Sequence, residues 1–233
     1  MFPTIHKYLT LPSTNTTAKE MILAGVREGV IVAEKQSAGR GRLGRSFFSE
    51  NGLFVSVILS PERISFAPSF LTSVAAVAVC RALRHYGFDV GIKWVNDLYF
   101  EGKKVCGILT EAVSCGSEIM GYVIGMGINL GEANFPPELS EIATSLPISG
   151  EKKEALLREI LIHLESALSE SADSLVSYLS EKSVILGTRI RFFGAREGEG
   201  VAVGLDAQGG LIVKAAENEI LTLTTGEISV RLQ

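Results

Sequence analysis

The chain has 233 residues, of which 46% are hydrophobic and 21% are charged, and its formal net charge is −4. This composition is typical of a soluble globular protein with room for one sizeable domain and a smaller one. The acidic balance argues against a general nucleic-acid binder, and no apolar run is long enough to cross a membrane.

The cysteine content and the N-terminal sequence indicate in which cellular compartment the protein is expected. Cys80, Cys106 and Cys115 are odd in number and form no C-x-x-C pair, and residues 1–7 resemble neither a signal peptide nor a transit peptide. These features predict a reduced, cytoplasmic protein. The three histidines are scattered, so no metal-binding cluster is predicted.

The first predicted elements are a strand over residues 5–9 and a helix over residues 18–25 that ends at Gly25. Between them, residues 12–17 read Pro-Ser-Thr-Asn-Thr-Thr. Oxygens of Ser, Thr and Asn accept hydrogen bonds from the free amides of a first helical turn. Five such residues exceed what one cap needs, so the run is either a cap alone or a cap whose hydroxyls also face a ligand.

The arginine loop, residues 36–45, reads Gln-Ser-Ala-Gly-Arg-Gly-Arg-Leu-Gly-Arg. Each guanidinium stays charged and cannot be buried unpaired, and the glycines leave backbone amides free to face a ligand. Forked cations suit an anion with several oxygens, such as a phosphate chain. The loop therefore predicts a polyanion-binding site.

Two common interpretations of this loop fail on context. Gly39, Gly41 and Gly44 match G-x-G-x-x-G after a predicted strand over residues 30–33, but a dinucleotide-binding fold needs a helix next. An Asn-Gly turn and a predicted strand over residues 53–59 follow instead. A kinase would need H-R-D and D-F-G motifs, which are missing. An exposed loop or an RNA-binding arm stays open.

Residues 67–86 predict a mostly buried helix ended by Gly87. Residues 91–111 then predict three strands joined by an Asn-Asp turn and a Glu-Gly hairpin turn. Lys93 and Lys104 flank this unit, and each is either a ligand-binding cation or a solvated edge-strand lysine.

Residues 118–129 predict a strand with two unlike faces, because successive side chains alternate. One face carries Gly121, Gly125 and Gly127 and is nearly bare, and the opposite face is apolar and resembles core. Gly107 of the preceding strand adds to the bare patch. A bare face indicates close approach either of a ligand or of another element, and the pattern does not separate the two.

Residues 152–170 have the apolar spacing of an amphipathic helix, and a second helix follows through residue 179. Five short strands with glycine-rich turns occupy the last fifty residues or so, which predicts a small separate barrel. The expected domains are residues 1–182 and 183–233.

The ordered set of motifs resembles the biotin protein ligases, of the monofunctional class without an N-terminal DNA-binding domain. The resemblance covers nearly the whole chain and rests on residues 13–15, 36–45, 93–97, 104–111 and 125–129, and on Gly-Leu-Asp, Gly-Gly-Leu and residues 225–229 near the end. It implies an α+β fold, with a mixed-sheet catalytic domain of the biotin/lipoate ligase type and a small C-terminal SH3-like β-barrel.

The resemblance implies a two-step ligation. Biotin reacts with Mg-ATP to give biotinyl-5′-AMP, and biotin then passes to a lysine of the biotin carboxyl carrier protein of acetyl-CoA carboxylase or a related carboxylase. A carboxylate that approaches a triphosphate is repelled by several kcal/mol per close pair in a partly buried site. Preplaced cations offset this repulsion. Mg²⁺ is expected to arrive with ATP, and the protein itself to supply no metal site.

The resemblance also assigns roles. The catalytic residues are expected to be Lys104, Arg40, Arg42 and Asp97, with Asp97 near the metal or the incoming lysine. The expected biotin-binding residues are Ser13, Thr14, Asn15, Gln36, Gly39, Arg40, Gly41, Arg42, Lys104 and Gly107. The expected nucleotide-binding residues are Arg42, Arg45, Phe47, Lys93, Asn96 and Asn129.

Three further expectations concern departures and motion. Phe47 stands where the family often has tryptophan, and Val95 stands where it usually has proline, which predicts altered packing and a less rigid turn. Because a reactive adenylate must be kept from water, residues 39–49 are expected to be mobile when empty and to order over the ligand. Only twelve residues precede Ser13, so no DNA binding is expected.

The main alternative is a lipoate–protein ligase or octanoyltransferase of the same fold, against which the arginine loop and the Lys-Trp-x-Asn-Asp motif argue. A non-catalytic RNA-binding protein is the alternative from another class, disfavoured by net acidity and the lack of interleaved aromatics. No membrane partner is expected, and the resemblance is compatible with a homodimer.

Overall fold

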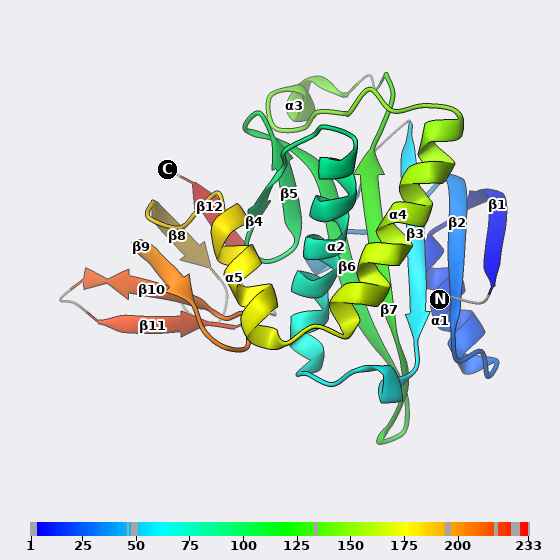
Figure 1. Ribbon diagram of the computed structural model, residues 1–233, viewed down its shortest axis with the longest axis horizontal. Coiled ribbons are helices and arrows are strands. Elements are labelled where there is room, and N and C mark those ends of the chain that lie inside the picture. Colours follow the sequence, from blue (N-terminus) through cyan, green and yellow to red (C-terminus); the bar gives the residue numbers. More distant parts are fainter. Residues whose placement is uncertain are drawn as a thin grey trace.

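A computed structural model of the chain describes residues 4–45, 47, 51–132, 135–193, 197–216, 219–224 and 229–232. It has two sheets, a large one that carries helices on both faces and a small one beside it (Figure 1). Among the described residues, no helix combines the length and the apolar character needed to cross a bilayer.

The large sheet has seven strands and is mixed. Its spatial order is β1 (Ile5–Leu11), β2 (Gly29–Gln36), β3 (Gly52–Leu59), β7 (Glu118–Asn129), β6 (Lys103–Cys115), β5 (Asp97–Phe100) and β4 (Gly91–Lys93). Only β1 and β2 are parallel in the described pairings. The tight turn between β5 and β6 places Glu101 and Gly102 at positive φ, as a two-residue hairpin requires.

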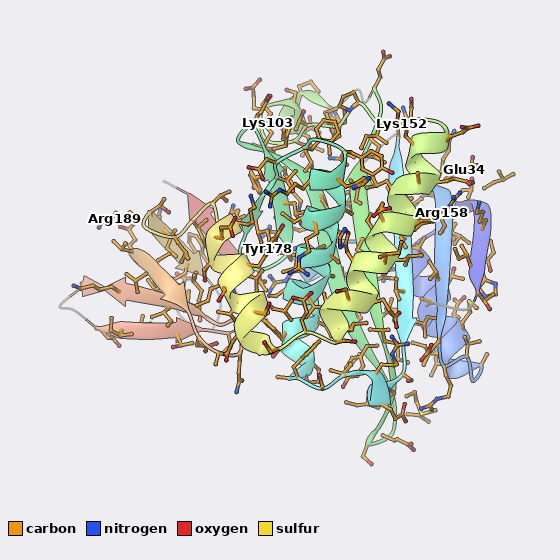
Figure 2. All side chains as sticks on the ribbon, in the orientation of Figure 1. Glu34, Lys103, Lys152, Arg158, Tyr178 and Arg189 are labelled. Atoms are coloured by element: carbon orange, nitrogen blue, oxygen red, sulfur yellow. The ribbon has the colours of Figure 1, made fainter. Side chains whose placement is uncertain are left out.

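Helices cover the large sheet unequally (Figure 1). Three lie on one face, namely α2 (Leu71–His85), α4 (Glu151–Leu168) and α5 (Ala172–Lys182), and α1 (Thr14–Leu23) lies on the other. α2 is rich in alanine and valine and almost wholly buried, because it packs both on the sheet and against α4. Figure 2 shows Tyr178 of α5 beside α2, where the Arg81 guanidinium lies 4.7 Å from the Tyr178 ring centre.

The predicted two-faced strand is confirmed as β7. Ile124, Met126 and Ile128 pack into the main core under α2 and α4. Val123 faces the other way, into a smaller cluster with Ala18 and Ile22 of α1. The bare positions therefore lie on the face that α1 covers only in part.

The small sheet is antiparallel and has five strands, in the predicted part of the chain. Its order is β11 (Ile220–Leu223), β10 (Leu211–Ala215), β9 (Gly198–Leu205), β8 (Arg189–Phe193) and β12 (Ser229–Leu232). Its own core includes Ile190, Phe192 and Leu211, and this core extends to Trp94 and Val95 of the β4–β5 turn. The Trp94–Val95 peptide bond is cis. The predicted motif at residues 225–228 lies outside the described residues.

Several boundaries differ from expectation. α1 begins at Thr14, four residues before the predicted start, because Ser13 takes the cap position and the threonines after it are helical. The predicted helix over residues 67–86 begins with a separate 3-10 turn (Pro68–Phe70) before α2. The short α3 (Pro137–Ser140) was not predicted.

Candidate active site

A cavity of about 660 Å³ opens between the first turn of α1, the arginine loop, the β4–β5 turn and the glycine-bearing parts of β6 and β7. It brings together most of the residues that the sequence singled out. Those that line it are Ser13, Thr14, Asn15, Gln36, Arg40, Gly41, Arg42, Arg45, Phe47, Lys93, Asn96, Asp97, Lys104 and Gly107.

One wall is the start of α1, held to the end of β2. Gln36 Oε1 accepts hydrogen bonds from the Thr14 backbone N–H (2.7 Å) and from Thr14 Oγ1 (3.2 Å). The Gln36 amide nitrogen remains as a donor, and it lies 3.2 Å from the position that a Cβ on Gly39 would take. Ser13 occupies the cap position but its side chain makes no capping hydrogen bond. Its hydroxyl is therefore available to a ligand, which favours the second of the two interpretations of this run.

Asn15 behaves differently from its neighbours, because its amide is fully used inside the protein. Asn15 Oδ1 accepts from Ser56 Oγ at 2.6 Å. Asn15 Nδ2 donates to the Leu109 carbonyl at 3.2 Å and to Glu111 Oε2 at 2.8 Å. Glu111 is held in turn by Lys19 of α1 at 2.8 Å. Asn15 thus fastens the start of α1 to β3 and β6, and its predicted biotin contact remains a prediction.

The arginine loop folds back on itself. The Phe47 N–H donates to the Gly39 carbonyl at 2.9 Å, and the Gly41 N–H donates to the Arg45 carbonyl at 2.7 Å. A side chain on Gly39 would lie 2.8 Å from the Phe47 carbonyl oxygen, so this closure needs glycine there. Gly39 itself shapes the loop and does not line the cavity.

The cations of the cavity lie beside complementary groups. Arg42 Nη1 donates to Asn96 Oδ1 at 3.3 Å. Burial lowers the pKa of Arg42, Asp97 raises it and Arg45 lowers it further. The pKa of an arginine is normally so far above 7 that Arg42 keeps its positive charge despite this lowering.

Lys104 and Asp97 form an ion pair, with 2.6 Å between Lys104 Nζ and Asp97 Oδ1. Lys104 Nζ and Asp97 Oδ1 are close but do not have hydrogen-bond geometry. Among the described residues, no other donor makes a hydrogen bond to the buried Asp97 Oδ1. Nearby, Lys93 Nζ lies 5.4 Å from the centre of the Tyr99 ring. Burial, and secondarily Asp97, raises the pKa of Tyr99. Lys104 and Asp97 therefore pair with each other at the cavity wall, and a ligand could replace either partner in this ion pair.

The cavity floor is formed by Gly107, Gly125 and Gly127. A side chain on Gly125 would meet Asn15 Oδ1 at 2.0 Å, and one on Gly127 would meet the Phe47 ring at 2.7 Å. Gly121 belongs to a different environment, because a side chain there would meet Ile22 of α1 at 3.3 Å. The bare patch therefore faces side chains of α1 at Gly121 and Gly125, and it lines the cavity at Gly107, Gly125 and Gly127.

Asn129, like Gly39, is a predicted site residue outside the cavity lining, and several lining residues have no predicted role. Asn129 is buried and does not line the cavity; its Nδ2 donates to the Thr144 carbonyl at 3.1 Å. Its nucleotide contact stays a prediction. The lining residues without a predicted role are Trp94, Tyr99, Ile108, Leu109, Met126 and Ile142, whereas Gly125 and Gly127 belong to the predicted bare face. Trp94 lies within a noted motif, but Ile142 comes from a loop with no local signal.

Comparisons with known proteins show the family to which the chain is similar. The profile of the Biotin/lipoate A/B protein ligase family matches residues 8–129, and that of the Biotin protein ligase C terminal domain matches residues 185–231. "Bifunctional ligase/repressor BirA" of Bacillus subtilis is 36% identical over 89% of this chain and 68% of its own length. "Biotin--[acetyl-CoA-carboxylase] ligase" of Paracoccus denitrificans is 30% identical over 87% of this chain and 90% of its own length. The solved biotin protein ligase from Aquifex aeolicus in complex with biotin and ATP has a TM-score of 0.87 and 28% identity, over 100% of both chains.

Proposed function

The chain belongs to the Biotin/lipoate A/B protein ligase family, and from this premise we propose that it is a biotin protein ligase that consumes ATP and forms AMP. The observation that carries the proposal is the cavity itself, where Arg40, Arg42, Arg45 and Lys104 surround a floor without side chains. The match of residues 185–231 to a biotin ligase C-terminal domain separates this chain from the lipoate alternative, which is not favoured.

In the first step a carboxylate oxygen of biotin attacks the α-phosphorus of ATP. An acyl–oxygen–phosphorus linkage forms, the bond from the α-phosphorus to the bridging oxygen breaks, and pyrophosphate leaves. Arg40, Arg42 and Lys104 are suited to offset the repulsion between the two anions, and they do so best as charge accumulates in the transition state. Arginine forks match the geometry of phosphate oxygens.

The neutral ring end of biotin needs both donors and acceptors. The α1 wall offers the Ser13 hydroxyl and the amide nitrogen of Gln36, whose orientation is fixed by Thr14. The aliphatic tail of biotin can then lie over the glycine floor. In this arrangement the carboxylate is proposed to lie toward Lys104, which also lines the cavity.

Mg²⁺ is proposed to enter this site as a companion of the nucleotide. Among the described residues no group of three or more His, Cys, Asp or Glu side chains could hold a metal ion, and Asp97 is the one acidic side chain in the cavity lining. Mg²⁺ commonly binds substrate phosphates with one or two carboxylates, so Asp97 is the residue that would approach it. When bound, the ion would neutralise phosphate charge.

In the second step the amine of a carrier lysine attacks the acyl carbon of the adenylate. An amide bond forms, AMP leaves and the amine loses a proton. Asp97 lines the cavity and is proposed to lie near this incoming amine. The acceptor is proposed to be a biotin carboxyl carrier protein, which the name of the Paracoccus denitrificans relative supports.

Other parts of the hypothesis stay predictions. They are the cytoplasmic location, the homodimer, the lack of DNA and membrane partners, and the division of the chain into domains at residues 182 and 183. The separate strand sets of the two sheets support that division.

ATP–pyrophosphate exchange with the purified chain tests the proposed function, run with biotin, with lipoate and with neither. Exchange with biotin alone is expected, and Lys104→Ala should lower it. Lys103→Ala is the matched control, because Lys103 is the adjacent lysine, donates to the Ser140 carbonyl at 2.8 Å and lies outside the cavity lining (Figure 2). No exchange with biotin by folded protein, or equal effects of the two variants, would overturn the proposal.

A further inference from the structure

We propose that Trp94 is a positioning residue. Through Trp94, the small C-terminal sheet holds Asn96 and Asp97 in position at the wall of the cavity. The proposal rests on the proposed function, which it deepens by assigning a part to the small sheet. It concerns the β4–β5 turn, residues 94–96, which carries Asn96 and leads directly into Asp97.

Trp94 joins the two sheets by a buried hydrogen bond. Its indole N–H donates to the Gly209 carbonyl at 2.8 Å, across 115 residues of sequence. Trp94 is only 8% exposed and packs in the core of the small sheet with Val95. An indole nitrogen can only donate, so in this buried position the carbonyl is the partner that satisfies it.

The turn that carries Gly209 is itself fixed on the small sheet. Asp206 Oδ1 accepts from the backbone N–H groups of Gln208 at 2.8 Å and Gly210 at 2.7 Å. The Asp206 N–H donates to the Gly210 carbonyl at 2.9 Å, which closes the loop. Gly209 has a φ of 77°, and a side chain on it would lie 2.5 Å from the Phe70 ring. The carbonyl that receives Trp94 is therefore held in place by its own turn and by close packing against Phe70.

On the other side, Trp94 lies two residues before Asn96 and three before Asp97. Asn96 accepts the hydrogen bond from Arg42, and its backbone carbonyl accepts from the Ile108 N–H at 2.8 Å. Asp97 pairs with Lys104. Asn96 and Asp97, the partners of Arg42 and Lys104, thus come shortly after Trp94 in the chain. Trp94 is the residue that the small sheet holds.

This connection predicts which kinetic parameter depends on Trp94. Arg42 and Lys104 act on charge that develops during adenylation, so a shift of their partners should lower kcat. The α1 wall with Gln36 and Thr14 is held independently, and the KM for biotin should therefore stay near its original value. Displacement of catalytic groups by about 1 Å can cost up to roughly a hundredfold in rate, and we expect about a tenfold loss for a partial shift.

Two variants test the connection from its two ends. Trp94→Phe keeps an aromatic ring but removes the N–H donor, and Asp206→Ala loosens the turn that presents Gly209. Each should lower kcat for biotin-dependent exchange about tenfold per active site, counted by the stoichiometric formation of biotinyl-5′-AMP, with little change in the KM for biotin. The double variant should be no worse than the worse single one, because both act on one hydrogen bond. Lys214→Ala, on an exposed position of β10, is the control.

A second readout does not require activity. The chain contains a single tryptophan, so its fluorescence reports on Trp94 alone. Asp206→Ala should shift this emission in the ligand-free protein, and Lys214→Ala should not. An unchanged kcat in both variants, a loss confined to the KM for biotin, additive losses in the double variant or an unshifted emission would each overturn the inference. Lack of exchange by the unmodified chain would instead count against the proposed function, whatever the emission shows.

Discussion

Replacing Gly125 with alanine is the sharpest single perturbation of the cavity floor. The new Cβ would lie 2.0 Å from Asn15 Oδ1, 2.7 Å from Cγ and 2.9 Å from Nδ2. The Asn15 amide cannot rotate away without losing its hydrogen bonds to Ser56, Leu109 and Glu111. The substitution should therefore move the start of α1, with Ser13 and Thr14, away from the floor.

The size of the effect follows from two contributions. Overpacking of a buried site costs about 1–3 kcal/mol, and each lost hydrogen bond costs about 0.5–1.5 kcal/mol. If half of this network survives by relaxation, the loss is about 3 kcal/mol, which lowers Tm by roughly 6–12 °C in a chain of this length. Because Thr14 orients Gln36, the KM for biotin should rise at least several-fold.

Calorimetry and exchange kinetics on Gly125→Ala and Gly121→Ala check this reasoning. Gly121 is the control, since it lies on the same face of β7 but a side chain there meets Leu59 O at 3.1 Å and Ile22 at 3.3 Å, which small shifts relieve. Gly121→Ala should leave the KM for biotin unchanged. In an Asn15→Ala background, Gly125→Ala should cost little further stability. Equal Tm losses in the two glycine variants, or an unaffected KM in Gly125→Ala, would refute the argument.

Three further predictions address the loop, the floor and pH. Backbone amides of residues 39–45 should exchange slowly with solvent only when biotin and ATP are bound; equal protection of the empty protein would contradict loop closure. In Gly127→Ala the new Cβ would lie 2.7 Å from the Phe47 ring and should displace that ring, with little loss of Tm. The lifetime of bound biotinyl-5′-AMP should then shorten several-fold, and an unchanged lifetime would contradict this. Mainly through burial, the pKa of His163 is lowered from the ordinary value of 6.5, so the unfolded chain binds more protons at this residue than the folded chain does. The free energy of unfolding should therefore fall as the pH drops below 6.5. Urea unfolding at pH 7.5 and 5.5 should show a smaller fall in His163→Gln than in the unmodified chain, and an equal fall would contradict this.

Local signals in the sequence account for most elements of the large sheet. The β4–β5–β6 unit follows from its Asn-Asp and Glu-Gly turns, and β7 follows from alternating glycines and apolar residues. The start of α1 was placed too late, because a run of Ser, Thr and Asn has low intrinsic helix propensity and tertiary contacts override it. Local patterns thus predict elements better than their ends.

The cavity was predicted where its residues lie in contiguous motifs and missed where distant segments complete it. Ile142 reaches the wall because its carbonyl accepts from the Lys104 N–H at 2.9 Å, a pairing with no periodic pattern. The bond from Trp94 to Gly209 joins residues whose sequence neighbourhoods are unrelated. The nucleotide contact of Asn129 rests on the family resemblance and stays a prediction, while its Nδ2 donates to the Thr144 carbonyl. Each miss depends on a long-range contact.

The bare floor limits how the substrate range of this cavity can be redesigned. Gly107, Gly125 and Gly127 have no side chains to trim, so any substitution there shrinks the space. Room for a bulkier biotin analogue must come from another wall. Ile142 is the favourable position, because it lines the cavity and is 58% exposed, so that shortening it sacrifices little core packing. A library built at this position would keep the cations and the α1 wall intact while admitting new acyl groups.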